Sequence, residues 1–154
     1  GVPNESNLPK DAELIYDEMV KREDIDKEKI VVMGRSIGTG LAVHLAAKKK
    51  VRGVILITPY DSLVSVAQKK LKFFPISLIM RNRFNSIAKA PGIDVPLLAL
   101  VAKRDEVIPS WHAIKLVKKW GGKTYLKIFD GVGHNTIQEH NEYWDSVNEF
   151  LRKI

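Results

Sequence analysis

The sequence has no cysteine, and several other familiar features are missing as well. Without a thiol the chain of 154 residues forms no disulfide and cannot use a thiolate in catalysis. No stretch comes near the roughly 20 apolar residues that a membrane-spanning helix needs. Internal repeats and low-complexity segments are also missing. These absences argue against disulfide scaffolds, thiol enzymes, repeat arrays and membrane-spanning proteins.

The composition that remains suits one soluble globular domain. Hydrophobic residues make up 45% of the chain, which is enough for a core, and we expect a single domain over residues 1–154. The net charge of +7 is uneven, because residues 1–29 carry nine acidic and five basic side chains. No nucleic-acid recognition motif accompanies the positive charge, so nucleic acid is not an expected partner. No secretory signal is visible, and a cytoplasmic location is the default expectation.

Helix-like and strand-like segments alternate along the chain. This alternation predicts an α/β fold with a mostly parallel sheet and helices on both faces. The first helix is expected to pack through an apolar face that contains Ile15 and Met19. The expected helices are Lys10–Arg22, Ile37–Lys49, Ser110–Trp120 and Gln138–Lys153, and the expected strands are Ile30–Met33, Val51–Thr58, an apolar run after Pro96, and Lys123–Phe129.

The segment Gly34-Arg35-Ser36-Ile37-Gly38 joins an expected strand to an expected helix. A G-x-S-x-G sequence in this context is typical of a sharp turn that exposes a strained serine near a helix N-terminus. We expect a side chain at either glycine to collide with neighbouring backbone. A glycine-rich turn often has only a structural role, so the motif by itself leaves both interpretations open.

Two further segments place polar residues after strands. Asp105 follows the apolar run that begins at Pro96, and His134 lies in a glycine-bracketed loop after the strand Lys123–Phe129. The carboxyl ends of parallel strands form the edge where sites of open α/β sheets occur. Glu106 is next to Asp105 and is the alternative acid, although the position in the loop favours Asp105.

With these motifs the sequence resembles the α/β-hydrolase superfamily, and within it the small abhydrolase-domain and serine-aminopeptidase-like branch. The matching residues are GRSIG around Ser36, KRDEVIP around Asp105 and GVGHN around His134, with support from residues 24–30 and 58–63. The resemblance implies that Ser36 is the nucleophile, His134 the general base and Asp105 the residue that orients it. It also implies that the backbone N–H of Ile37 is an oxyanion donor and that the intermediate is an acyl-enzyme. No metal or organic cofactor is implied.

The chain departs from the family in one respect. The family supplies a second oxyanion donor from a loop after an early strand, but only 35 residues precede Ser36 and the chain starts with Gly1. We therefore expect the C-terminal portion of a longer hydrolase fold, without its N-terminal strands and with a half-built oxyanion hole. Loss of one such donor costs about 10²–10³ in rate, so this chain alone is expected to have little activity.

Residues 61–94 interrupt the alternation and are predicted to be a short helical cap inserted in the domain. The segment is apolar, and its large residues are interpreted either as the lining of an acyl pocket or as packing onto the core. It is also basic, and a solvated face is the commoner explanation for such charge than contact with a membrane surface. The apolar residues are Leu71, Phe73, Phe74, Pro75, Ile76, Leu78, Ile79, Met80 and Phe84, and the basic ones are Lys69, Lys70, Lys72, Arg81, Arg83 and Lys89.

The sequence thus predicts a serine hydrolase acting on a carboxylic ester, thioester or amide, with an acyl or other small-molecule substrate. Carboxylesterase-like activity is favoured because the cap is apolar. Aminopeptidase-like cleavage would need an acid that binds a free amine, for which Asp61 is the candidate. A non-catalytic interaction module with a hydrolase fold is the remaining alternative. His44, His112 and His140 lack the spacing of metal ligands. His44 is interpreted as packed or partly exposed, and His112 and His140 are expected on helices.

Overall fold

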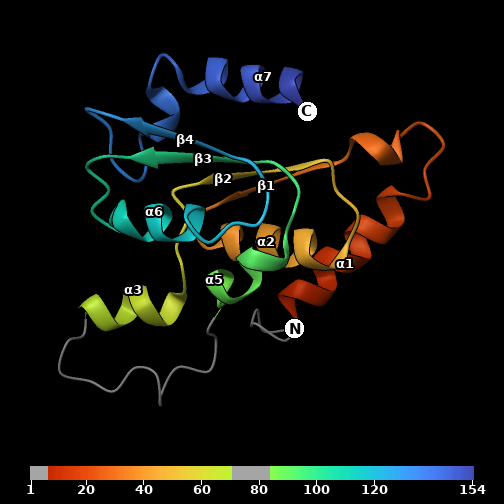
Figure 1. Cartoon of the computed structure of the whole chain (residues 1–154), viewed down its shortest axis with the longest axis horizontal. Helices are drawn as coiled ribbons and strands as arrows, with labels where there is room; N and C mark the ends of the chain where they lie inside the picture. The colour runs from red at the N-terminus through yellow and green to blue at the C-terminus, as the bar shows by residue number, and fades with distance from the viewer. Residues whose placement is uncertain (1–6, 71–83) are drawn as a thin grey trace.

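A computed structural model describes residues 7–70 and 84–154, and its centre is a four-stranded parallel sheet (Figure 1). The strands are β1 (Val31–Arg35), β2 (Gly53–Ile57), β3 (Leu97–Ala102) and β4 (Thr124–Phe129), and they lie in the order β1-β2-β3-β4. Every neighbouring pair is parallel. The predicted α/β class and all four predicted strands are confirmed, with boundaries that differ by a few residues.

Helices cover both faces of this sheet, as the sequence predicted (Figure 1). The strands follow one another in a single direction, and parallel crossovers are right-handed, so the connecting helices gather on one face. That face carries α2 (Gly38–Lys48), α5 (Ser86–Lys89) and α6 (Trp111–Val117), while α7 (Tyr143–Lys153) lies on the other. The remaining elements are α1 (Leu8–Met19), α3 (Leu63–Lys70) and the 3₁₀ turns η1 (Lys27–Lys29), η2 (Ala90–Gly92) and η3 (Ile137–Glu139).

The central strands are apolar throughout because the sheet is covered on both faces. All five residues of β2 and all six of β3 are buried. Successive side chains of a strand point to opposite faces, so Val54 and Leu56 join the core layer under α2 and α6, whereas Ile55 and Ile57 join the layer under α7. Phe150 of α7 is 2% exposed in the second layer. These two layers fix the strands that end at the candidate site.

The first helix does not pack as expected. Ile15 is 65% exposed and Met19 is 39% exposed, so the predicted apolar face is wrong for these two residues. Tyr16 of α1 packs against the core layer that contains Ala42 and Val43 of α2. Two polar contacts add to this, because Glu13 accepts from His44 and Asp17 accepts from Lys49. The spacing of apolar residues predicted that this segment is a helix, but it did not predict which face of the helix is buried.

The last predicted helix, Gln138–Lys153, is divided in two. Its start is the short turn η3, and α7 begins only at Tyr143. His140 therefore lies between the two elements rather than on a helix, and its ring stacks on Phe129 with centroids 4.5 Å apart. The predicted place of His140 on a helix is therefore wrong.

The cap segment is described only in part. Its residues 71–83 lie outside the described ranges, and with them most of the apolar and basic residues that define it. Phe84 is 4% exposed and packs with Tyr60 and Ile108, which supports core packing rather than pocket lining at this position.

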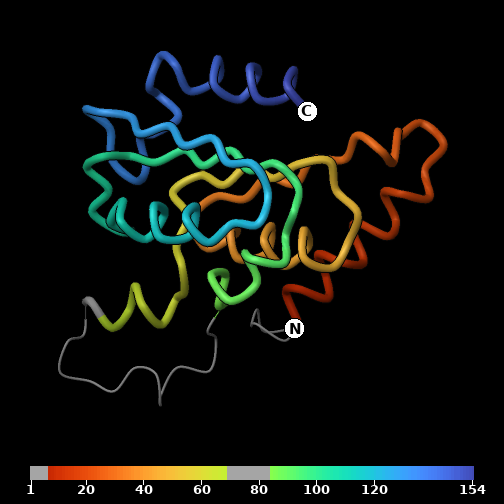
Figure 2. Tube along the Cα trace, in the orientation of Figure 1, coloured from red at the N-terminus to blue at the C-terminus, as the bar shows by residue number. Residues whose placement is uncertain are grey.

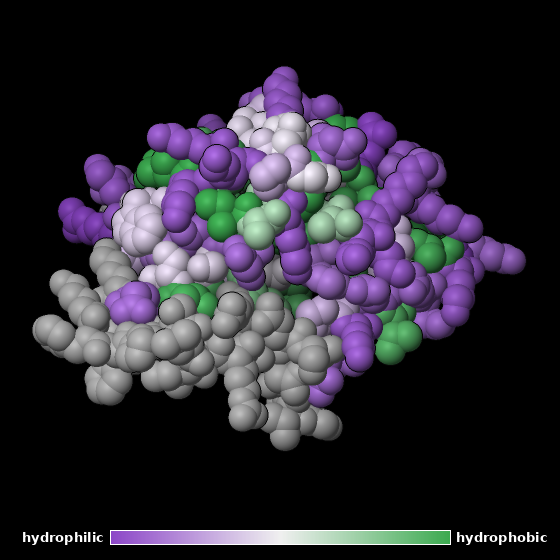
Figure 3. Space-filling view, turned by 60° about the horizontal axis from the view of Figure 1, so that its bottom comes forward, coloured by the Kyte–Doolittle hydropathy of each residue, from purple (hydrophilic) through white to green (hydrophobic). Residues whose placement is uncertain are grey.

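On the coloured part of the face in Figure 3, hydrophobic residues form small separate patches among hydrophilic ones. None of the described helices is long and apolar enough to cross a membrane.

Candidate active site

The loops that follow β1, β3 and β4 leave the sheet at one edge. In the strand register Arg35 is opposite Ile57, and Ala102 is opposite Phe129, so neighbouring strands end at the same level. Figure 2 shows the chain after β3 and after β4 turning at the same end of the sheet. Residues far apart in sequence therefore meet at this edge.

Ser36 occupies a strained turn directly after β1. Its φ of 51° lies in the left-handed region, which non-glycine residues seldom adopt. The Ser36 amide donates to the Ile57 carbonyl at 2.9 Å, which ties the turn to β2. A Cβ at Gly34 would be 2.4 Å from the Gly38 carbonyl oxygen, as expected for so tight a turn. The same expectation for Gly38 is wrong, because a Cβ there would meet nothing within 4 Å.

Hydrogen bonds from Thr39 and Tyr60 fix the turn of Ser36 where it enters α2. The Ser36 carbonyl accepts from the amide of Thr39 at 3.0 Å and from its hydroxyl at 2.6 Å. The hydroxyl of Tyr60 donates to the Ile37 carbonyl at 3.1 Å. Ile37 is the N-cap of α2, so its amide belongs to a helix N-terminus, where N–H groups lack partners inside the helix and favour negative charge.

The three side chains singled out by the sequence form one continuous hydrogen-bonded chain. The Ser36 Oγ lies 2.9 Å from His134 Nε2, and His134 Nδ1 lies 3.0 and 2.8 Å from the two carboxylate oxygens of Asp105. Asp105 and His134 are buried, at 8% and 6% exposure. With a carboxylate on Nδ1, the neutral ring carries its proton there and presents Nε2 as an acceptor for the serine hydroxyl.

The Asp105 carboxylate is held in place by its own loop. The amides of Val107 and Ile108 donate to its Oδ1 at 2.9 and 2.7 Å. Glu106, the alternative acid, accepts instead from the backbone amide of His134 at 3.3 Å. The loop thus directs Asp105 to the imidazole and Glu106 to the main chain.

Sequence analysis did not find a polar cluster formed by Asp61, His112 and Lys115, in which the Lys115 side chain is 55% exposed. His112 Nδ1 lies 2.6 Å from one carboxylate oxygen of Asp61, and Lys115 Nζ lies 3.1 Å from the other. Asp61 and His112 are 1% and 0% exposed. Asp61 and His112 are 51 positions apart in the sequence, so no local signal indicates this pairing.

The pKa of Asp61 reflects this environment. Burial by itself raises the pKa, but hydrogen bonds from His112, Lys115 and the Ser62 amide outweigh burial and lower it from 3.8 to about 2. Asp61 therefore stays ionised inside the protein and keeps its hydrogen bonds.

Within residues 7–70 and 84–154, no three histidine, aspartate or glutamate side chains gather as metal ligands would.

Sequence comparisons relate the chain to known proteins over nearly its whole length. A family model described as serine hydrolase matches residues 8–153. Alpha/beta hydrolase domain-containing protein 17B of Homo sapiens is 30% identical over 154 residues, which cover 98% of this chain and 51% of that protein. An uncharacterized protein of Mycobacterium tuberculosis is 25% identical over 153 residues, covering 98% of this chain and 54% of that protein. The chain thus spans about half the length of these relatives.

The fold also resembles solved structures. An acetyl xylan esterase from Paenibacillus sp. R4 superposes with a TM-score of 0.78 at 17% identity, covering 95% of this chain and 52% of that one. A second acetyl xylan esterase, from Thermoanaerobacterium sp., gives a TM-score of 0.71 at 21% identity, covering 92% of this chain and 50% of that one. At these identities the likeness concerns the fold.

Proposed function

Because the chain belongs to the serine hydrolase family and has the α/β-hydrolase fold, we propose that it cleaves a carboxylic ester, thioester or amide at Ser36. The observation that carries this proposal is the unbroken chain of hydrogen bonds from the Ser36 hydroxyl through His134 to Asp105. A serine becomes a nucleophile when an adjacent base accepts its proton and a third group orients that base.

The reaction follows from these positions. The Ser36 Oγ attacks the substrate carbonyl carbon while its proton passes to His134 Nε2, and Asp105 stabilises the imidazolium. The oxyanion that forms accepts a hydrogen bond from the Ile37 amide at the start of α2. Collapse expels the alcohol, thiol or amine, which takes the proton from Nε2 and leaves an acylated Ser36. Water then attacks the acyl carbon while His134 Nε2 takes its proton. The bond between the acyl carbon and the Ser36 oxygen breaks, the carboxylic acid leaves, and Nε2 returns the proton to Ser36.

Carboxylic esters are the favoured substrate class. Aminopeptidase-like cleavage needs an acid that can reach a free amine, but Asp61 is buried and already binds His112 and Lys115. Beside the nucleophile, the Ile37 side chain is 58% exposed and offers apolar surface to an acyl or alkyl group. We expect a small acyl ester to be hydrolysed faster than an amide that carries a free amino group.

Steady-state hydrolysis of p-nitrophenyl acetate tests this proposal. An activated ester is chosen because it needs less stabilisation of the oxyanion. We expect Ser36→Ala and Asp105→Asn to lower kcat by about 10³-fold or more, because each removes a member of one catalytic unit. Ser146→Ala is the matched control, since this serine lies on α7 and donates to the Glu142 carbonyl of the preceding turn.

Two results would count against the proposal. Equal rates for wild type and Ser36→Ala would favour a non-catalytic interaction module with this fold. Faster release of p-nitroaniline from an amino acid p-nitroanilide than of p-nitrophenol from the acetate would favour the aminopeptidase-like alternative.

A further inference from the structure

The candidate base is held through its backbone as well as its ring. Asp105 and Ser36 bond the two ring nitrogens of His134. Two other residues, Arg35 and Glu106, bond the carbonyl and the amide of the same residue. His134 therefore has four partners, and each lies next in sequence to one of the others.

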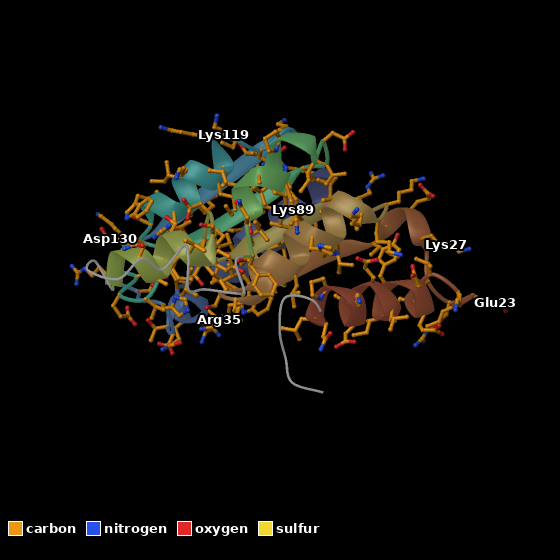
Figure 4. All side chains as sticks on the ribbon, turned by 90° about the horizontal axis from the view of Figure 1, so that it is seen from below. Glu23, Lys27, Arg35, Lys89, Lys119 and Asp130 are labelled. Atoms are coloured by element: carbon orange, nitrogen blue, oxygen red, sulfur yellow. The ribbon has the colours of Figure 1, made fainter. Side chains whose placement is uncertain are left out.

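Arg35 is the last residue of β1 and comes immediately before Ser36. Its Nη2 donates to the His134 carbonyl at 3.1 Å. Figure 4 shows Arg35 on the side of the molecule that carries Asp130, the residue that opens the His134 loop.

Glu106 contacts His134 from the loop that follows β3, the strand next to β4. It follows Asp105 in the loop after β3, and its Oε2 accepts from the His134 amide at 3.3 Å. A Cβ on Gly133 would lie 2.8 Å from this oxygen, so the glycine leaves room for the carboxylate. The loop also contains Gly131 with a φ of 74°, and two glycines give its backbone freedom that an external contact can restrict.

We propose that Arg35 and Glu106 are positioning residues that clamp the His134 backbone so that the imidazole meets Ser36 and Asp105 together. The chain after β1 supplies Ser36 to the imidazole, and the preceding residue Arg35 bonds the His134 carbonyl. The loop after β3 supplies Asp105 to the imidazole, and the following residue Glu106 bonds the His134 amide. The His134 loop is thereby tied to β1 and to the loop after β3 independently of the ring. This role rests on the proposed function of Ser36 and His134. A misplacement of about 1 Å at a catalytic group costs on the order of 10²-fold in rate.

Paired substitutions separate positioning from general stability. Arg35→Met and Glu106→Met remove the donor and the acceptor at similar side-chain length. Arg35→Lys keeps a positively charged donor on a slightly shorter side chain, and Glu106→Gln keeps an acceptor oxygen at the same side-chain length. Arg152→Met is the control, because Arg152 is an exposed residue of α7.

The first measurement is p-nitrophenyl acetate hydrolysis. We expect both methionine variants to lower kcat by about 10- to 100-fold with KM changed less than about twofold, because placement of the base is lost while substrate contacts remain. The lysine and glutamine variants should recover most of kcat, and Arg152→Met should match wild type. Equal losses in the methionine and conservative variants, together with a lowered melting temperature, would overturn the proposal in favour of a purely structural role.

A second measurement does not depend on turnover. The proton on His134 Nδ1, bonded to Asp105, is expected to give a slowly exchanging low-field proton NMR signal that Asp105→Asn abolishes. This signal should broaden or disappear in Arg35→Met and Glu106→Met, and persist in Arg35→Lys and Glu106→Gln. An unchanged signal in both methionine variants would overturn the clamp. If wild type lacks the signal and a fluorophosphonate does not label Ser36, both the clamp and the proposed function are overturned. If the signals show the expected pattern but Ser36 is not labelled, the proposed function alone is overturned.

Discussion

Replacing Asp61 with asparagine should destabilise the protein in a way that depends on pH. The folded-state pKa of Asp61 is about 2, against 3.8 for an unperturbed aspartate. Since one pH unit corresponds to about 1.4 kcal/mol, the ionised carboxylate contributes roughly 2 kcal/mol to the free energy of unfolding. Because the pKa of Asp61 is lower in the folded than in the unfolded protein, folding favours the ionised carboxylate and the contribution is stabilising. It is fully present above about pH 4 and is lost as the pH falls from there towards 2.

Urea unfolding of wild type and Asp61→Asn from pH 6 to pH 2.5 measures this contribution. At pH 6 the variant should be less stable by roughly 2 kcal/mol or more, because His112 also loses its charged partner in a buried site. The gap between the two proteins should narrow as the pH falls below 4. Asp145→Asn, an exposed position on α7, is the control for loss of one surface carboxylate. A gap that stays constant down to pH 2.5 would refute the polar cluster of Asp61, His112 and Lys115.

Three further predictions concern stability and follow from the packing. Gly34→Ala should lower the free energy of unfolding by about 1–3 kcal/mol through overpacking, whereas Gly38→Ala should change it far less, and a reversed order in urea unfolding would contradict the turn geometry. Tyr60→Phe should cost about 1 kcal/mol in the same assay by removing the hydrogen bond to the Ile37 carbonyl, and no change would refute that bond. Phe150→Ala should lower the free energy of unfolding by about 3–5 kcal/mol and lower the urea concentration at the unfolding midpoint. A decrease below about 1 kcal/mol, as at an exposed position, would contradict the packing of α7 on the sheet.

The edge that carries the candidate site was predictable because it depends on a simple regularity. Parallel strands place their carboxyl ends together, so a serine, an aspartate and a histidine that each follow a strand are expected to converge. The structure brings Ser36, Asp105 and His134 within hydrogen-bond distance. Strand patterns and turn residues, both local signals, were sufficient to place them.

Long-range polar pairing was not predictable in the same way. Nothing in the sequence near Asp61 shows that it will meet His112, and nothing near Arg35 shows that it will reach the His134 carbonyl. Such contacts depend on how helices and loops are placed after the sheet has formed. The buried face of α1 was mispredicted for a related reason, because its side-chain partners, His44 and Lys49, are 31 and 32 positions away in the sequence.

The most direct test of the central claim is covalent labelling of the folded chain with a fluorophosphonate, followed by peptide mapping by mass spectrometry. The reagent captures a serine that a neighbouring base activates, whatever the natural substrate is. The account predicts a single adduct on the peptide that contains Ser36, absent from Ser36→Ala and from urea-unfolded protein. A folded wild-type chain without an adduct, or with the adduct on another residue, would contradict it.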